Sequence, residues 1–290
     1  MTLRALVLGG GGQVGRALAR VAPAGIDVMS RSSHETDVRD HIAVRRAIEE
    51  SGANLIINCA AFTNVDSAES SPGLAAEINA IAPGLIANEA RRAGARLLHV
   101  STDYVFDGAT GIPYEPGAPT TPINVYGATK REGERALLSA DPDATIVRTA
   151  WVHSGTSPCF VARAVSMLCA GTEMRVVDDQ FGTPTAANHL AAALWRIAHQ
   201  TNIRGVLHFT DAGVASWFDV AIAVLDSLNA LGRAPAEASV VPVASASYSP
   251  AARRPPCAVL DKHSSWQSIG WTPPHWRVGV VDSVREILHA

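Results

Sequence analysis

The chain has 290 residues, of which 47% are hydrophobic and 18% are charged, with a net charge of −3. This composition excludes a disordered protein and fits one large domain or two interlocked domains. The sequence has no dense basic run and no apolar run near the ~20 residues that cross a bilayer, so we expect neither a nucleic-acid nor a membrane partner. The short apolar start predicts a first strand rather than a secretory signal, so a cytoplasmic location is expected.

Short apolar runs alternate with stretches of helical periodicity through the first half of the sequence. The predicted strands are residues 3–8, 26–29, 55–59, 96–101 and 145–148, and the predicted helices are residues 14–19, 42–48 and 74–93. This alternation is typical of βαβ units on a parallel sheet. The strands are continuously apolar, which indicates that helices cover both faces of that sheet.

The second half of the sequence is less regular. We predict loops at residues 108–122 and 152–158, a helix at 190–199, a strand at 206–209, and a loop or short strands at 233–256. The whole pattern predicts an α/β fold, a Rossmann doubly wound parallel sheet with a smaller C-terminal α/β substrate lobe. The predicted dinucleotide-binding domain is residues 1–152, with 186–210 returning to it, and the substrate lobe is residues 153–185 and 211–290.

A glycine-rich loop follows the first predicted strand and opens the first helix. Gly9, Gly12 and Gly15 fit the pattern GxxGxxG, which lets the backbone turn tightly and approach a pyrophosphate. The N-terminus of the following helix supplies amide donors and the positive end of a dipole. Such loops also serve only as connections, but the position directly after a first strand favours a dinucleotide cofactor.

The end of the second strand bears on which dinucleotide is bound. A site that prefers NAD usually has a carboxylate there, which binds the ribose hydroxyls. This sequence has Arg31 between serines instead, and an arginine beside hydroxyls suits a 2′-phosphate. We therefore predict a preference for NADPH, with NADH possible as a second cofactor; the alternative is a solvated loop arginine.

Tyr126 and Lys130 form the pattern YxxxK, which places both side chains on one face of a helix. An ammonium beside a phenol lowers the pKa of the tyrosine, which can then act as a general acid or base. Thr102 lies at the carboxyl end of a predicted strand, where α/β sheets bind ligands. A hydroxyl, a tyrosine and a lysine beside a dinucleotide loop indicate carbonyl reduction by hydride transfer.

Seven segments together resemble the extended short-chain dehydrogenase/reductase family over almost the whole chain. They are GQVG at 12–15, NCAAFTNVD at 58–66, STDYVFDG at 101–108, NVYG at 124–127 followed by TK, RTAWV at 148–152, DDQFG at 178–182 followed by PT, and ARRP at 252–255. STDYVFDG and DDQFG are particular to a branch of reductases for nucleotide-linked 4-keto-6-deoxysugars. The resemblance implies NADPH-dependent reduction of the C4 keto group of such a sugar, with dTDP-4-dehydro-L-rhamnose as the expected substrate.

The resemblance also implies roles for single residues. Tyr126 would donate the proton, Lys130 would assist it and bind the nicotinamide ribose, and Thr102 would orient the C4 carbonyl. Asp103 and Trp151 would contact the sugar nucleotide, although Trp151 could instead be a core tryptophan. The implied cofactor contacts are Gly9, Gly12, Gln13 and Val14 at the pyrophosphate, Asp37 and Val38 by the adenine, and Ala60, Ala61 and Phe62 along the cofactor's middle. Gln180 and Arg254 are interpreted as structural loop residues.

The chain departs from the family pattern at three positions in or near the substrate lobe. His153 stands where tyrosine is usual, Cys159 where asparagine is usual, and Cys257 where serine is usual. These differences bear on the identity of the sugar more than on the reaction. The first helix lacks the glutamate through which some relatives bridge a dimer with Mg²⁺, so no metal is expected, and a homodimer is expected only by family analogy.

Two other functions stay open from the sequence. The first is a nucleotide-sugar epimerase or dehydratase of the same superfamily, which would regenerate its cofactor within each cycle. The second is a cofactor-binding regulatory subunit without catalysis, against which the retention of Thr102, Tyr126 and Lys130 argues. The four cysteines show neither disulfide nor zinc spacing, and we expect them to be reduced and mostly buried.

Overall fold

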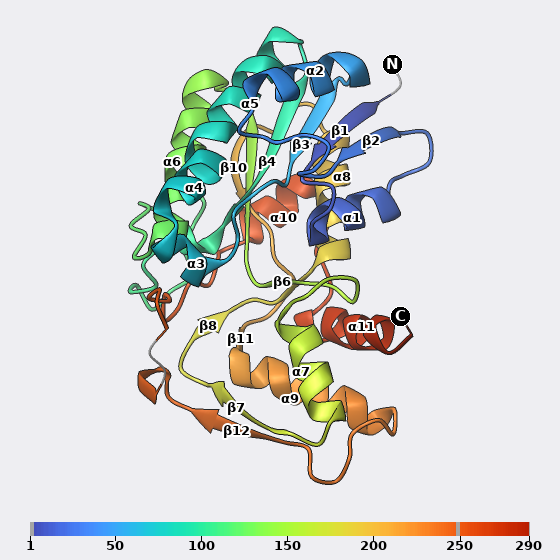
Figure 1. Ribbon diagram of the computed structural model, residues 1–290, viewed down its shortest axis with the longest axis vertical. Helices are drawn as coiled ribbons and strands as arrows, with labels where there is room; N and C mark the ends of the chain where they lie inside the picture. The colour runs from blue at the N-terminus through green and yellow to red at the C-terminus, as the bar shows by residue number, and fades with distance from the viewer. Residues whose placement is uncertain (1–2, 248–249, 290) are drawn as a thin grey trace.

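A parallel sheet of six strands forms the upper part of the molecule in the computed structural model, and a smaller lobe lies below it (Figure 1). The structure describes residues 3–247 and 250–289. The ends of the two predicted domains at residues 1–2 and 290, and residues 248–249 of the predicted lobe, therefore lie outside the described residues. Within the described ranges, no helix combines the length and the apolarity that a bilayer crossing requires.

The main sheet has the strand order β10-β5-β4-β3-β1-β2. Its strands are β1 (Arg4–Leu8), β2 (Asp27–Arg31), β3 (Leu55–Asn58), β4 (Arg96–Thr102), β5 (Thr145–Thr149) and β10 (Gly205–His208). Every neighbouring pair is parallel, so the predicted doubly wound sheet is confirmed. Because β1 has β2 on one side and β3 on the other, the chain order reverses there, and a crevice opens beyond the carboxyl ends of these strands.

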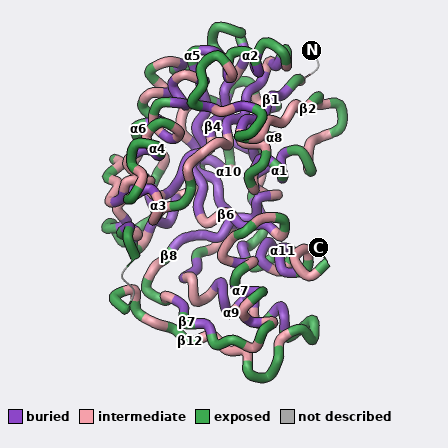
Figure 2. Tube along the Cα trace, in the orientation of Figure 1, coloured by how far each residue is buried: buried purple, intermediate pink, exposed green. Residues whose placement is uncertain are grey.

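Helices cover both faces of the sheet, as the continuous apolar strands predict. One face carries α1 (Gln13–Arg20), α8 (Ala187–His199) and α10 (His263–Ile269), and the other carries α2 (His41–Ser51), α5 (Ala82–Arg92) and α6 (Val125–Ala140). Alternate residues of β1 enter the two cores, Ala5 and Val7 on one side and Leu6 and Leu8 on the other. The inner strands β1, β3, β4 and β5 are accordingly mostly buried, whereas the edge strand β2 is only partly buried (Figure 2).

The lower lobe has a core of its own, between three helices and short strand ladders. Its elements are β6 (Val152–His153), α7 (Phe160–Cys169), β7 (Glu173–Val177), β8 (Phe181–Gly182), β9 (Thr185–Ala186), β11 (Ala215–Ser216), α9 (Trp217–Ala230), β12 (Ser239–Val243) and α11 (Trp276–His289). The chain crosses between the two parts several times. Residues far apart in sequence, such as Val152 and Thr185, therefore pair at the junction.

The predicted helix at residues 74–93 is continuous but not regular. It comprises α4 (Pro72–Ala76), a π-helical turn (Glu77–Ile81) and α5. Pro83 has no N–H to donate to the carbonyl of Asn79, four residues earlier, so the regular ladder is interrupted at that point. That carbonyl lies against Gly133 of α6, where a Cβ atom would be 1.9 Å from it. A pattern of apolar spacing does not register such a local insertion.

One short helix of the predicted substrate lobe, α10, packs away from the core of the lower lobe. Residues 211–290 were expected in the substrate lobe, yet α10 packs beside α8 on one face of the main sheet. Ile269, 1% exposed, belongs to the same core as Trp195. The apolar residues of this short helix complete the core of the dinucleotide domain, which sequence order alone does not indicate. The predicted loop at 152–158 contains the short strand β6, and β12 agrees with the prediction of a loop or short strands at 233–256.

A buried ion pair joins α6 to the sheet. The Arg148 guanidinium on β5 donates to both oxygens of Glu134 on α6, at 2.9 and 2.7 Å. Glu134 also accepts a hydrogen bond of 2.5 Å from the hydroxyl of Ser101 on β4. Both partners of the ion pair have only 5% of their side-chain area exposed. The pair therefore fixes the position of α6 relative to β4 and β5.

We predict that Glu134→Ala lowers the free energy of unfolding by about 3–5 kcal/mol, because it leaves the Arg148 charge buried without its partner. Urea denaturation measures this. Arg135→Ala is the matched control, since it removes an ion pair with Glu132 on the exposed face of the same helix, and it should change stability by less than about 1 kcal/mol. Equal losses in the two variants would contradict the prediction.

Candidate active site

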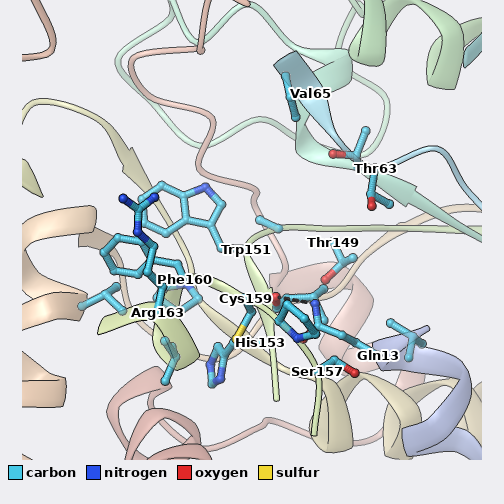
Figure 3. A pocket seen from close by; sticks show the side chains of 18 of the residues that line it. Gln13, Thr63, Val65, Thr149, Trp151, His153, Ser157, Cys159, Phe160 and Arg163 are labelled. Carbon is cyan, nitrogen blue, oxygen red and sulfur yellow. Dashed lines mark hydrogen bonds between the residues drawn. The ribbon is translucent and has the colours of Figure 1, made fainter. Parts of the chain in front are cut away.

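A cavity of about 1100 Å³ opens between the carboxyl ends of the strands and the lower lobe. The glycine loop, the end of β4, the start of α6 and residues 149–153 and 156–161 line it. Figure 3 shows Gln13, Thr149 and His153 among the side chains that line it. Among the described residues, four buried side-chain polar atoms have no hydrogen-bond partner. Three of them, on Asp103, Thr149 and His153, belong to residues that line this cavity. Since buried polar groups are normally paired, this concentration indicates a place for a polar ligand.

The glycine loop fits tightly between neighbouring strands. Gly9 has a φ of +81°, and a Cβ there would lie 2.5 Å from the backbone nitrogen of Ala60. A Cβ on Gly15 would lie 2.5 Å from the carbonyl oxygen of Gly9, so α1 can pack against the loop only with glycine at that position. Gly12, Gln13 and Val14 line the cavity at the N-terminus of α1. The loop therefore forms a cradle of the kind that holds a dinucleotide pyrophosphate.

The sequence shows an arginine and no carboxylate at the end of β2, but the structure brings two carboxylates close to this point. Arg31 is the last residue of the strand, and its Nη2 lies 3.3 Å from Glu50 Oε2. Glu35 folds back so that its carboxylate accepts from the amide and the hydroxyl of Ser32, at 2.8 and 2.7 Å. The spacing of Ser32 and Glu35 matches a capping pattern and could have revealed this carboxylate. The expected contact Asp37 is bound to Arg39.

Some of the residues expected at the site line the cavity and others do not. Those that line it are Gly12, Gln13, Val14, Ala61, Thr102, Asp103, Tyr126, Lys130 and Trp151. Those that are absent from its lining are Gly9, Arg31, Asp37, Val38, Ala60 and Phe62. Gly9 and Ala60 nevertheless touch each other where the cradle meets β3.

Thr102, Asp103 and Tyr126 lie together at the end of β4. The Thr102 hydroxyl donates to Asp103 Oδ1 at 3.0 Å and accepts from the Tyr104 amide at 3.2 Å. The ring of Tyr104 packs edge-on against that of Tyr126, with centroids 5.6 Å apart. Burial raises the pKa of Asp103 to about 7, so this carboxyl changes its charge near neutral pH. A hydroxyl, a carboxyl and a phenol thus face one part of the cavity.

The pKa of Tyr126 corrects the expectation that Lys130 lowers it. Burial raises this pKa to about 12, against a hydrogen bond with Thr102 that lowers it. Lys130 instead directs its Nζ toward β4, where it donates to the Val100 carbonyl at 2.8 Å and lies 3.2 Å from His99 Nε2. Tyr126 is therefore held protonated, which is the form that a proton donor requires.

Trp151 occupies a strained and tightly enclosed position. Its φ of +46° is unusual for a residue with a side chain and costs about 1–3 kcal/mol. Its indole stacks on that of Trp217, with centroids 3.6 Å apart and planes within 8°. Gly182 leaves room for the ring, because a Cβ there would lie 2.6 Å from Trp151 Cε2. Figure 3 shows the indole beside Phe160 and Arg163 on one side of the cavity.

The lower part of the cavity holds positive charge and two of the three family-atypical residues, His153 and Cys159. Arg163 and Arg175 line it, and the sequence analysis missed both, as it missed Trp217. Only Trp217 could have been noticed in the sequence, because it directly follows Ser216, the capping-box residue that starts α9. Arg254, which was interpreted as structural, pairs with Asp66 at 2.6 Å and also lines the cavity.

Cys159 and His153 both make hydrogen bonds within the lower lobe. Cys159 caps α7, where its sulfur accepts from the Ala162 amide. His153 is bonded to Ser283 at 3.0 Å, and burial lowers its pKa to about 4. All four cysteines are free thiols, as expected, but each is partly exposed rather than buried.

Comparison with known proteins gives consistent matches over the whole chain. The model of the RmlD substrate binding domain family matches residues 3–289. The chain is 40% identical to the dTDP-4-dehydrorhamnose reductase of Mycolicibacterium smegmatis, over 100% of this chain and 88% of that protein. It is 39% identical to a probable dTDP-4,6-dihydroxy-2-methyloxan-3-one 4-ketoreductase of Streptomyces antibioticus, over 99% of this chain and 97% of the relative.

A solved structure agrees with these relatives. The dTDP-4-dehydrorhamnose reductase of Bacillus anthracis in complex with NADP matches with a TM-score of 0.91 and 29% identity, over 100% of both chains. The sheet, the glycine cradle and the residues at the end of β4 define an NAD(P)H-dependent oxidoreductase of the extended short-chain dehydrogenase/reductase type. Within that class, the chain belongs to the RmlD substrate binding domain family, which confirms the resemblance drawn from the sequence.

We predict that Asp103→Asn gains stability relative to the unmodified protein as the pH rises from about 4 to 7. An unfolded aspartate ionises near pH 4, whereas Asp103 in the folded chain does so at about 7. Between these values the folded state binds more protons, so its free energy of unfolding falls with pH, by at most about 1.4 kcal/mol per unit. The asparagine variant lacks this loss. Urea denaturation at several pH values measures the difference.

Asp107→Asn is the control with the opposite sign. A hydrogen bond from Tyr114 holds the pKa of Asp107 below its usual value, so the ionised form stabilises the fold above about pH 4. From about pH 4 to 7 this variant should be less stable than the unmodified protein by a nearly constant amount, because the effect of Asp107 changes with pH only below about pH 4. A difference that does not change with pH for Asp103→Asn would show that this carboxyl is ionised throughout.

Proposed function

We propose that this chain is an NADPH-dependent reductase of the C4 keto group of a nucleotide-linked 4-keto-6-deoxysugar, with dTDP-4-dehydro-L-rhamnose as its substrate. The observation that carries the proposal is the half-buried, protonated Tyr126, held beside Thr102 at the edge of a dinucleotide cradle. The reductase relatives, one of them solved with NADP, support the same reaction.

The residues of the cradle fit the proposed cofactor. Gly12, Gln13 and Val14 would hold its pyrophosphate at the N-terminus of α1, where free amides and the helix dipole favour an anion. Arg31, at the end of β2, would meet the 2′-phosphate in place of its present partner Glu50. Asp37 and Val38 would lie by the adenine, and the segment of Ala60, Ala61 and Phe62 would follow the middle of the cofactor. When bound, the reduced nicotinamide supplies a hydride.

The polar residues at the end of β4 complete the reaction. Thr102 would donate its hydroxyl hydrogen to the C4 carbonyl oxygen and so orient the sugar. Tyr126 would give its phenolic proton to the same oxygen as negative charge develops there. Lys130 would bind the nicotinamide ribose and, as an ammonium, stabilise the tyrosinate that is left. Burial keeps water away from these groups, which strengthens each of these interactions.

The lower part of the cavity suits a sugar nucleotide. Trp151, fixed by Trp217 and Gly182, provides a flat apolar wall for a sugar ring. Arg163 and Arg175 lie further along the same cavity, where a diphosphate would need positive charge. Asp103, with one unpaired oxygen, would contact the sugar. Local arginines carry this role because the net charge of −3 provides no general positive field.

We predict that Tyr126→Phe lowers kcat about 10²–10⁴-fold with NADPH and dTDP-4-dehydro-L-rhamnose, because it removes the proton donor. NADPH absorbance measures the rate, and the unmodified enzyme should consume one NADPH for each sugar reduced. An epimerase or dehydratase would consume none, and a regulatory subunit would show no turnover.

Tyr104→Phe is the matched control for this variant. It removes a second phenol that packs against Tyr126 in the same cavity, and its hydroxyl interacts with Arg254 rather than with Thr102. We expect it to lower kcat less than 10-fold, because phenylalanine keeps the ring contact with Tyr126. Full activity in Tyr126→Phe, or equal losses in both variants, would remove Tyr126 from the role of proton donor.

We predict that Gly182→Ala raises KM for the sugar nucleotide by about 10-fold or more and leaves the Kd of NADPH unchanged. The added methyl group displaces the Trp151 indole from its slot, and small misplacements of a binding wall weaken substrate positioning. Gly117→Ala is the control, since nothing lies within 4 Å of its Cβ position. An unchanged KM in Gly182→Ala would exclude Trp151 as a substrate contact.

A further inference from the structure

A chain of three buried side chains runs behind the tyrosine and lysine of the site. Asn58 ends β3, His99 lies in β4, and both are almost completely buried, with 1% and 0% of their area exposed. Asn58 Nδ2 lies 3.1 Å from His99 Nδ1, and His99 Nε2 lies 3.2 Å from Lys130 Nζ. The Ala60 amide lies 3.0 Å from Asn58 Oδ1. No role for Asn58 or His99 follows from the reaction described above.

The Ala60 amide determines the direction of the hydrogen bonds that follow it, from Asn58 to His99 and from His99 to Lys130. A backbone N–H can only donate, so Asn58 turns its oxygen toward Ala60 and its NH₂ group toward His99. An amide NH₂ also only donates, so His99 Nδ1 must be the acceptor. A neutral imidazole has one acceptor and one N–H, and its proton is therefore on Nε2. That N–H points at Lys130.

This direction disfavours the charged form of Lys130. An ammonium group has three donors and no acceptor, whereas an amine has a lone pair that can accept from His99. Burial acts in the same sense, since it lowers the pKa of Lys130 to about 8. It also holds the pKa of His99 well below its usual value, which excludes an imidazolium as the alternative.

The other titratable groups around Lys130 do not cancel this effect. Cys59, directly after β3, is a neutral thiol because desolvation raises its pKa to about 12. Glu134, one turn further along α6, favours the ammonium but is already bonded to Arg148 and Ser101. Tyr126, one turn earlier, is protonated. His99 is thus the neighbour whose proton faces the lysine nitrogen directly.

We propose that Asn58 and His99 are positioning residues for the catalytic pair: Asn58 locks His99 in the Nε2–H form, and His99 lowers the proton affinity of Lys130. Lys130 then gains or loses its charge close to neutral pH instead of remaining an ammonium. In the resting site the phenol of Tyr126 keeps its proton, because no permanent cation draws it away. The ammonium form, present at lower pH, stabilises the tyrosinate during turnover.

The tautomer of His99 is the direct test, and it requires neither substrate nor cofactor. The chain has 10 histidines, and the ring nitrogens of ¹⁵N-histidine-labelled protein report which nitrogen carries the proton. His99→Leu assigns the signal by its loss. We expect Nε2–H with an unprotonated Nδ1 from about pH 6 to 9. An Nδ1–H or a doubly protonated ring in this range overturns the proposal, whatever reaction the enzyme catalyses.

Asn58→Asp should reverse the direction of the hydrogen bonds from residue 58 through His99 to Lys130, since it changes only a few atoms. A carboxylate accepts from both neighbours, so His99 must turn its proton to Nδ1 and present Nε2 as an acceptor to the Lys130 ammonium. We expect the ¹⁵N signals to show this switch. We also expect the pH above which kcat/KM for the keto sugar falls to rise by one unit or more, a part of the test that rests on the proposed function.

A double-mutant comparison separates this effect from the added charge. If Asn58→Asp acts through the imidazole, its pH shift should be at least threefold smaller when His99→Leu is also present. A shift of the same size in both backgrounds would show that the carboxylate acts by charge alone, and would overturn the proposal. If the unmodified protein has the expected tautomer but shows no reductase activity, only the proposed function is contradicted.

Discussion

The carboxylate of Glu134 determines where the chemistry of this protein takes place. It lies between α6, β4 and β5, and Arg148 and Ser101 satisfy both of its oxygens inside the protein. A buried charge without such partners would be strongly destabilising, so this contact allows little freedom in how α6 sits on the sheet. Because α6 also carries Tyr126 and Lys130, their approach to the end of β4 depends on it.

Burial sets the protonation states of the groups that this contact brings together. It raises the pKa of Tyr126 and of Asp103 and lowers that of Lys130, in each case because the charged form loses its hydration. Asp103 and Lys130 thereby come closer to proton exchange near pH 7, whereas Tyr126 is held more firmly in its protonated form. A YxxxK pattern implies a lysine that acidifies its tyrosine, but here Lys130 directs its Nζ toward β4 and desolvation raises the pKa of Tyr126.

The lower lobe contributes shape rather than titratable groups. Trp151 holds a left-handed backbone conformation at the junction, and the stacked Trp217 and the missing side chain of Gly182 hold its indole in place. Strain of this kind persists only where the surroundings determine the position from several sides. The wall of the cavity is therefore fixed before any ligand arrives. The arginines beyond it supply charge where the molecule as a whole is slightly acidic.

The sequence by itself determined the parallel sheet, the glycine cradle, the family and the residues Thr102, Tyr126 and Lys130, because each depends on local spacing or on a motif within one segment. Only the tertiary structure decided which residues become neighbours across segments. The α10 helix shares a core with α8 and the main sheet, and Trp217 stacks on Trp151. The chain from Ala60 through Asn58 and His99 to Lys130 links three elements. Its direction follows from donor and acceptor geometry, which no spacing along the sequence encodes.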